Sequence, residues 1–245
     1  MKQHICLTNV FQKSCKFVSQ PLVLCALIAT AQAGSSRNVC SSDVAVSSIY
    51  FIPHIKDYCR TSTPCEKFKR QVRLQGSGTL SGNRLLTYTG KTRSMGSCDT
   101  SFGASGNCLI PFISVAADPR FYSMGDIIQM PSMKGKVLTL PNGKTMVHPG
   151  FLIVHDTGGA IRGKNRFDFF TGSYSMRDPG NPFGSKGRKD LQMLDRTSCT
   201  DNKKFTVVRR GSYYYQNSLL AIEDSLRDVY SDRKVMVASN SRGAR

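Results

Sequence analysis

The sequence contains no tryptophan, and acidic residues are scarce. Its 16 Asp and Glu stand against 34 Lys and Arg, which gives a formal net charge of +18. An excess this large predicts attraction to polyanions, with a merely solvated basic surface as the alternative. The basic segments lack regular interleaving with aromatic residues and lack a recognition-helix pattern, so we expect no specific binding of nucleic acid.

Signals for bound metals and cofactors are also missing. The chain has four histidines and no C-x-x-C pair, and no histidine is spaced to complete a tetrahedral zinc site. Gly158-Gly159 lacks the spacing of a phosphate-binding loop, and Ser77 lacks the G-x-S-x-G elbow of a serine nucleophile. We therefore expect no metal, no cofactor and no serine-based catalysis.

Residues 1–33 have the features of a cleaved secretory signal. Three lysines and no acidic residue precede an apolar run at 21–30, and Ala31-Gln32-Ala33 then provides an A-x-A cleavage site. The apolar run is too short to span a bilayer comfortably, which disfavours a membrane anchor. We expect a periplasmic or secreted protein, for which anionic cell-envelope polymers become the expected polyanionic partners.

Export determines how the cysteines are interpreted, because disulfides form in oxidising compartments. The cysteines that remain after residue 33 are Cys40, Cys59, Cys65, Cys98, Cys108 and Cys199. These allow three disulfides in many pairings, and the sequence does not choose among them. If near neighbours pair, Cys59–Cys65 and Cys98–Cys108 each close a short loop, and Cys40 is left for Cys199.

Short apolar runs separated by turns predict a mainly β fold, closed as a barrel of short strands over residues 67–212. The strand candidates are residues 72–74, 85–88, 109–117, 125–130, 136–140, 151–155, 166–170 and 204–209. Residues 34–66 are expected to form an N-terminal extension stapled by cysteines. Apolar residues at helical spacing from Asn217 predict a helix within residues 213–245, with Ser218 as its N-cap and a basic tail after it.

Asp168 is the first candidate for catalysis. In a strand at residues 166–170 the side chains alternate, so Phe167 and Phe169 point to one face and Arg166, Asp168 and Phe170 to the other. A carboxylate among aromatic rings loses hydration, which raises its pKa and suits it to act as a general acid. The alternative is a strand-end carboxylate in a surface ion pair with Arg166 or Lys164.

Two further aspartates and a histidine stand near turns. Asp156 follows an apolar strand and precedes Thr157-Gly158-Gly159, where glycines allow a ligand close to the backbone; the alternative is an Asx turn. Asp118 precedes Pro119, a pair that often only starts a turn. His155 is adjacent to Asp156 in its strand, so the two face opposite sides and His155 is expected to be a packed or surface histidine.

These segments together resemble the three-aspartate (3D) domain of MltA-type lytic transglycosylases and stationary-phase survival proteins. The matching segments are DPR at 118–120, DTGGAIRG at 156–163 and RFDFF at 166–170, with LQGSG at 74–78 and LTYTG at 86–90 upstream. The resemblance spans roughly residues 70–210 in the same order.

The resemblance implies a double-psi β-barrel of about six strands, and an expected monomer that cleaves peptidoglycan glycan strands without cofactor. It places the catalytic aspartate at Asp168, with Asp156 shaping its hydrogen bonding and Asp118 completing the catalytic cluster. The implied substrate-binding residues are Gln75, Gly76, Ser77, Tyr88, Thr157, Gly158 and Gly159. Protonated Asp168 would cleave the MurNAc–GlcNAc bond as a lyase, leaving a 1,6-anhydroMurNAc end.

Three other functions remain open from the sequence. A two-carboxylate hydrolase would use Asp156 or Asp118 to activate water. A wall-binding module would use the basic surface without catalysis. A secreted, disulfide-rich factor acting on a host or prey is compatible with the cysteines. Three retained aspartates favour the enzyme, because a binder would gain nothing from carboxylates that repel an anionic glycan.

Overall fold

The computed structural model describes residues 40–194 and 196–230, all within the unit Asn38–Arg245. The expected signal segment at 1–33 and the basic tail from residue 231 lie outside the described residues. Among the helices of the described part, none is long and apolar enough to cross a membrane.

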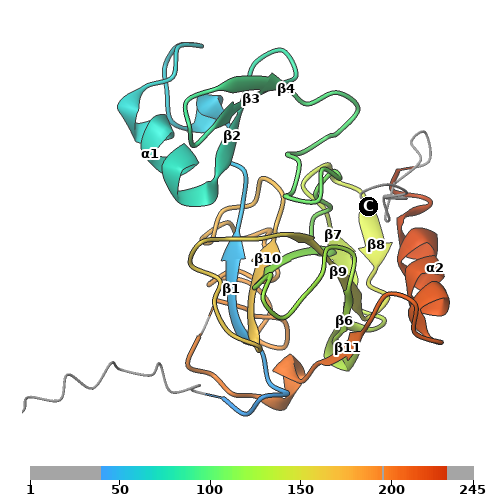
Figure 1. The fold of residues 1–245 in the computed structure, drawn as a ribbon. Helices are drawn as coiled ribbons and strands as arrows, with labels where there is room; N and C mark the ends of the chain where they lie inside the picture. Colours follow the sequence, from blue (N-terminus) through green and yellow to red (C-terminus); the bar gives the residue numbers. More distant parts are fainter. Residues whose placement is uncertain (1–39, 195, 231–245) are drawn as a thin grey trace, which may run out of the picture. The chain divides into compact units, whose positions relative to one another are not determined.

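The centre of the fold is a six-stranded sheet in the order β1-β10-β5-β9-β6-β11 (Figure 1). The pairs β1/β10 and β5/β9 are parallel, and the other neighbours are antiparallel. The strands are β1 (Val46–Tyr50), β5 (Ser114–Ala117), β6 (Ile127–Gln129), β9 (Phe151–Asp156), β10 (Arg166–Phe170) and β11 (Thr206–Val208). The fold is therefore mainly β, as the sequence predicts. Residues 46–50, expected in an N-terminal extension, provide an edge strand of this central sheet.

The two edge strands of this sheet, β1 and β11, approach each other at one point. An isolated antiparallel bridge joins Val44 to Lys204, and the N–H of Ala45 donates to the carbonyl of Lys203 at 2.9 Å. The described residues show no continuous ladder that closes the sheet. The closed double-psi barrel remains a prediction.

Two smaller sheets accompany the central one. They comprise β2 (Ser77–Leu80), β3 (Arg84–Thr87) and β4 (Thr92–Ser94), and the hairpin β7 (Val137–Thr139) with β8 (Thr145–Val147). Single turns of 3-10 helix occur at Ile55–Asp57, Pro131–Met133 and Asp201–Lys203. Gly82 and Asn83, with φ of 73° and 57°, form the turn between β2 and β3, where a left-handed conformation favours these residue types.

The predicted strand at 72–74 is wrong, because these residues belong to helix α1 (Glu66–Gln75). Phe68 and Val72 are the buried side chains of this helix, and their four-residue spacing places them on one face. The helix ends at Gly76, which has a φ of 93°. The four-residue spacing of Phe68 and Val72 indicates a helix. The prediction of a strand came from β-branched Val72 and Leu74, two apolar residues two positions apart.

The main hydrophobic core packs against the central sheet and includes consecutive residues of β9, Leu152, Ile153 and Val154, so at this strand it covers both faces. Phe167 and Phe169 are fully buried in it, and Phe167 makes an edge-to-face contact with Phe205 at 4.9 Å. Phe170 lies in a second cluster with Tyr50 and Ala116. The predicted alternation of β10 is therefore confirmed, with the phenylalanines at 167 and 169 inward and residue 168 on the other face.

The predicted C-terminal helix is confirmed as α2 (Tyr215–Leu226), which contacts β6, β8 and β9 (Figure 1). Its buried side chains include Leu219, Ile222 and Leu226. The predicted N-cap is wrong: Ser218 lies inside the helix and its hydroxyl donates to the carbonyl of Tyr214 at 2.9 Å. The helix begins at Tyr215, two residues before the Asn217 at which the apolar pattern starts, and the Tyr215 side chain is buried.

The described residues contain three disulfides: Cys40–Cys199, Cys59–Cys65 and Cys98–Cys108. The near-neighbour pairing is thus the observed one. Two disulfides close short loops, and the third joins segments 159 residues apart.

Candidate functional site

Every predicted site residue except Asp118 lines one cavity of about 720 Å³. Its walls come from the end of α1 and the start of β2, from the loop between Cys98 and Cys108, and from the turn after β9. The residues it shares with the sequence prediction are Gln75, Gly76, Ser77, Tyr88, Asp156, Thr157, Gly158, Gly159 and Asp168. Segments that are far apart in the sequence therefore converge on the two aspartates.

Asp168 lies at the centre of β10 and is half-buried. The hydroxyl of Ser48 on β1 donates to Asp168 Oδ1 at 2.5 Å, and Arg166 Nη2 donates in turn to Ser48 Oγ at 2.5 Å. Burial raises the pKa of Asp168, while the Ser48 hydrogen bond and the charge of Arg166 oppose the rise. The raised pKa favours the protonated carboxyl, which is the form a general acid requires.

Asp156 lies at the end of β9 and accepts three hydrogen bonds. The backbone N–H groups of Ala104 and Thr157 donate to Oδ1, each at 2.9 Å, and the hydroxyl of Tyr50 donates to Oδ2 at 3.2 Å. Burial raises the pKa of Asp156, and all three donors oppose the rise. Burial and the charge of Asp156 raise the pKa of Tyr50 well above its ordinary value, so this phenol stays a donor.

The strand register explains why the two carboxylates share a cavity. Ala116 of β5 is the cross-strand partner of Asp168 on one side and, across a β-bulge, of Asp156 on the other. The two aspartates therefore flank Ala116, with their backbones about 10 Å apart across two strand spacings. The methyl side chain of Ala116 lines the cavity and leaves space between the carboxyl groups.

Asp118 does not line the cavity. Its Oδ2 accepts hydrogen bonds from Arg120 Nη2 at 2.6 Å and from the N–H of Gly163 at 2.8 Å. The Arg120 guanidinium holds the pKa of Asp118 well below its usual range. The carboxylate thus fixes the backbone turn that leads into β10. Within the described residues, no three His, Cys, Asp or Glu side chains are grouped as a metal site requires.

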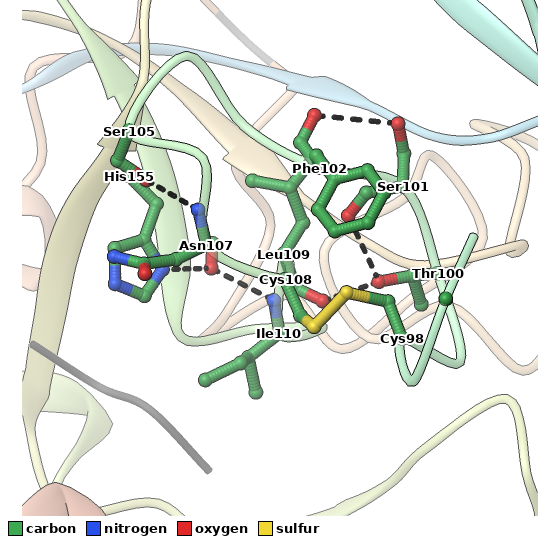
Figure 2. Close-up of a disulfide and its surroundings, with 12 residues drawn as sticks. Cys98, Thr100, Ser101, Phe102, Ser105, Asn107, Cys108, Leu109, Ile110 and His155 are labelled. Atoms are coloured by element: carbon green, nitrogen blue, oxygen red, sulfur yellow. Dashed lines mark hydrogen bonds between the residues drawn. A yellow bond between two sulfur atoms is a disulfide. The ribbon is translucent and has the colours of Figure 1, made fainter. Parts of the chain in front are cut away.

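His155 faces away from Asp156, as strand alternation predicts. It is fully buried, and its Nδ1 lies 2.9 Å from the hydroxyl of Ser114. Its carbonyl accepts a hydrogen bond from the N–H of Ser105 at 3.0 Å, which places His155 directly beneath the loop closed by Cys98–Cys108 (Figure 2). Of the two environments expected for His155, packed or at the surface, the structure has the packed one.

Three groups that contact the aspartates are not predicted from the sequence: the hydroxyls of Ser48 and Tyr50 and the backbone N–H of Ala104. Ser48 and Tyr50 alternate along β1, so both point to the face of Asp168 and Phe170. Their sequence signal is limited to polar groups two positions apart, at 48 and 50, in the run VSSIY. Ala104 contacts Asp156 through its backbone N–H, so its residue type gives no indication of the contact.

The rim of the cavity is basic and aromatic. Arg73 and Arg93 are the cationic side chains that line it, and exposed Tyr88 stands beside them. Arg73 lies 4.0 Å from Glu66, which pairs more closely with Lys69 at 2.9 Å. The rim therefore offers guanidinium groups to an anionic ligand.

Residues 113–192 match the family described as the 3D domain. All three aspartates lie in this segment, and the resemblance stated from the sequence is confirmed. No curated protein matches the chain.

Solved lytic transglycosylases show a partial likeness. MltA from Escherichia coli is 26% identical, with 34% of this chain and 23% of that chain covered, at a TM-score of 0.21. The membrane-bound lytic murein transglycosylase from Agrobacterium tumefaciens is 28% identical over 33% and 21% of the two chains, at 0.22. LtgG of Burkholderia pseudomallei is 28% identical over 33% and 22%, at 0.22. This chain thus spans less than a quarter of each structure's length.

Proposed function

We propose that the protein is an exported peptidoglycan lytic transglycosylase that uses Asp168 as a single general acid and base. The observation that carries the proposal is the pair of half-buried carboxyl groups in one cavity, each with a different set of donors. Burial raises the pKa of both carboxyl groups; Asp156 accepts three hydrogen bonds that favour its anion, whereas Asp168 accepts one from Ser48, and the charge of Asp156 adds to the rise in its pKa. The carboxyl with fewer donors to its anion is the better candidate for the acid, and the other for its charged neighbour.

The reaction follows from that division. Protonated Asp168 donates its proton to the glycosidic oxygen, the C1–O bond of MurNAc breaks, and positive charge develops at C1. Asp168, now a carboxylate, accepts the proton of the C6 hydroxyl, and that oxygen bonds to C1. The products are a 1,6-anhydroMurNAc end and a free GlcNAc hydroxyl, and no water is consumed. Anionic Asp156 supports the first step because it keeps the proton on Asp168.

Asp118 has a supporting part in this proposal. Because it binds Arg120 and the Gly163 N–H away from the cavity, it positions the turn before β10 and does not touch substrate. Gln75, Gly76, Ser77 and Tyr88 line one wall of the cavity, and Thr157, Gly158 and Gly159 line another. We propose that these walls bind the glycan strand, on a closed double-psi barrel in a monomeric, periplasmic or secreted protein.

Digestion of purified peptidoglycan sacculi by the chain tests the proposal, with the products read by mass spectrometry. Fragments that end in 1,6-anhydroMurNAc are the expected result. Reducing ends would instead establish a hydrolase.

A wall-binding module is the second candidate, and one observation favours it: residues 66–94 hold seven Lys and Arg and one Glu. Tight binding to sacculi without release of soluble fragments would establish this alternative.

Replacing Ser48 with Ala is expected to move the alkaline limb of the pH–activity profile to higher pH. The Ser48 hydrogen bond lowers the pKa of Asp168, so its loss raises that pKa and keeps the acid protonated further up the pH scale. The pH dependence of sacculus cleavage measures the shift. Ser47→Ala is the matched control, because Ser47 is buried on the opposite face and its hydroxyl has no hydrogen-bond partner within the described structure. An unmoved limb in Ser48→Ala would contradict the assignment of Asp168 as the acid.

Removing both rim arginines, as Arg73→Gln with Arg93→Gln, is expected to weaken cleavage of anionic glycan strands by roughly fivefold, since exposed ion pairs contribute about 0.5 kcal/mol each. The KM for strands that retain the lactyl or peptide carboxylates should rise, and the effect should shrink at high salt. Arg84→Gln is the control, since Arg84 is exposed on β3 but does not line the cavity. An equal loss on a neutral chitin oligosaccharide would contradict carboxylate binding.

A further inference from the structure

The loop between Cys98 and Cys108 forms one side of the cavity. Four consecutive residues of this loop, at positions 101–104, line the cavity. Its disulfide joins residues 10 positions apart, so the segment is a small closed ring (Figure 2). The ring contains no helix and no strand longer than a single bridge, between Phe102 and Cys108. Its shape therefore depends on the cross-link and on a few hydrogen bonds.

The ring is attached to β9 beside the candidate acid pair. The N–H of Ala104 donates to Asp156 Oδ1 at 2.9 Å, and the N–H of Ser105 donates to the carbonyl of His155 at 3.0 Å. Gly103 permits this approach, since a Cβ there would lie 2.3 Å from the His155 carbonyl oxygen. On the other side, the hydroxyls of Ser101 and Ser77 lie 2.9 Å apart and link the ring to β2.

We propose that the disulfide ring is a positioning element for Asp156: the Cys98–Cys108 cross-link holds the Ala104 N–H on the Asp156 carboxylate, and full activity requires it. The inference rests on the proposed function for its activity assay. It extends that function by assigning a role to a disulfide and a backbone group that contact no reacting atom.

The physical reason lies in the difference between the two carboxyl groups. Ala104 is one of three donors that stabilise the anion of Asp156, and the charge of Asp156 in turn raises the pKa of Asp168. If the ring opens, the N–H leaves, the anion of Asp156 loses a hydrogen bond, and the proton is no longer directed to Asp168. A hydrogen bond to a charged group is strong enough for its loss to reduce the rate by roughly tenfold.

The test uses a double variant of the full chain in which Cys98→Ala and Cys108→Ala are combined. Its digestion of sacculi is compared with that of the wild type. We expect roughly a tenfold loss of kcat. Cys59→Ala with Cys65→Ala is the matched control, since it opens a disulfide of similar span outside the cavity and should retain activity. Both variants are then repeated in an Asp156→Asn background. If the ring acts through Asp156, opening it there has no further effect.

Two results would overturn the inference. One is an unchanged kcat in the variant with the opened ring. The other is the same fold-loss of kcat with and without Asp156→Asn, which would show that the ring lines the cavity without acting through Asp156. If the opened ring does not fold, Gly103→Ala provides the same test with the disulfide intact, because its Cβ displaces the loop from His155.

A carboxyl-carbon NMR titration of Asp156 keeps the inference separate from the proposed function. The pKa of Asp156 should be higher in the opened ring than in the wild type, because a donor to the anion is lost. This readout needs no enzymatic activity. A wild type that releases no fragments would therefore contradict the proposed function alone, and an unshifted Asp156 would contradict the positioning role alone.

Discussion

Replacing Asp168 with Asn is expected to reduce the release of 1,6-anhydroMurNAc fragments by about 100-fold to 10,000-fold, the usual contribution of a general acid. Asn has nearly the same shape as Asp and still fits between β1 and β5, but it has no proton to donate to the glycosidic oxygen. Binding to sacculi should remain, because the glycan-binding walls are unchanged. Mass spectrometry of timed digests, with pull-down of the protein on sacculi, measures both quantities.

The control for Asp168→Asn is Asp201→Asn, which removes an exposed carboxylate that pairs with Lys204 at 2.9 Å. Exposed pairs of this kind contribute little, so activity should stay near that of the wild type. Asp156→Asn provides the informative comparison. If it abolished cleavage while Asp168→Asn retained more than a tenth of the rate, the roles of the two carboxyl groups would have to be exchanged.

The sequence predicted the site well wherever its signal was local. Strand alternation placed Asp168 opposite Phe167 and Phe169, and the glycines after Asp156 marked a wall of the cavity. These predictions succeed because side-chain direction in a strand depends only on residue number. They concern β9, whose apolar run FLIV identifies a strand, and β10, whose phenylalanines at 167, 169 and 170 do the same.

Contacts that depend on distant pairing could not be predicted. Ser48 reaches Asp168 because β1 pairs in parallel with β10, across 120 residues of sequence. Nothing local in the run at 46–50 specifies that partner, and so the segment was assigned to an extension. For Asp118 the local motif gives the wrong expectation. The DPR motif predicts that Asp118 belongs to the catalytic cluster, but hydrogen bonds from Arg120 and the Gly163 N–H hold its carboxylate away from the cavity.

Removing the Cys40–Cys199 disulfide, as Cys40→Ala with Cys199→Ala, is expected to give the largest loss of stability among the three. A cross-link stabilises mainly by restricting the unfolded chain, and the restriction grows with the loop that it closes. The separations are 159, 10 and 6 residues for the three disulfides. On this basis the free energy of unfolding should fall by about 5 kcal/mol for Cys40–Cys199 and by about 2 to 3 kcal/mol for the short loops.

The position of Cys40–Cys199 strengthens the expectation. Cys40 precedes β1 and Cys199 precedes β11, so the bond joins the segments that lead into the two edge strands, which the Val44–Lys204 bridge also links. Thermal unfolding should therefore show a drop in Tm of roughly 10 to 20 °C for this variant, given about 2 to 4 °C per kcal/mol for a chain of this size. Cys59→Ala with Cys65→Ala is the control. An equal drop in Tm for the two double variants would show that the stabilisation by a disulfide does not depend on the length of the loop it closes. It would also show that the core, rather than the Cys40–Cys199 bond, holds the edge strands together.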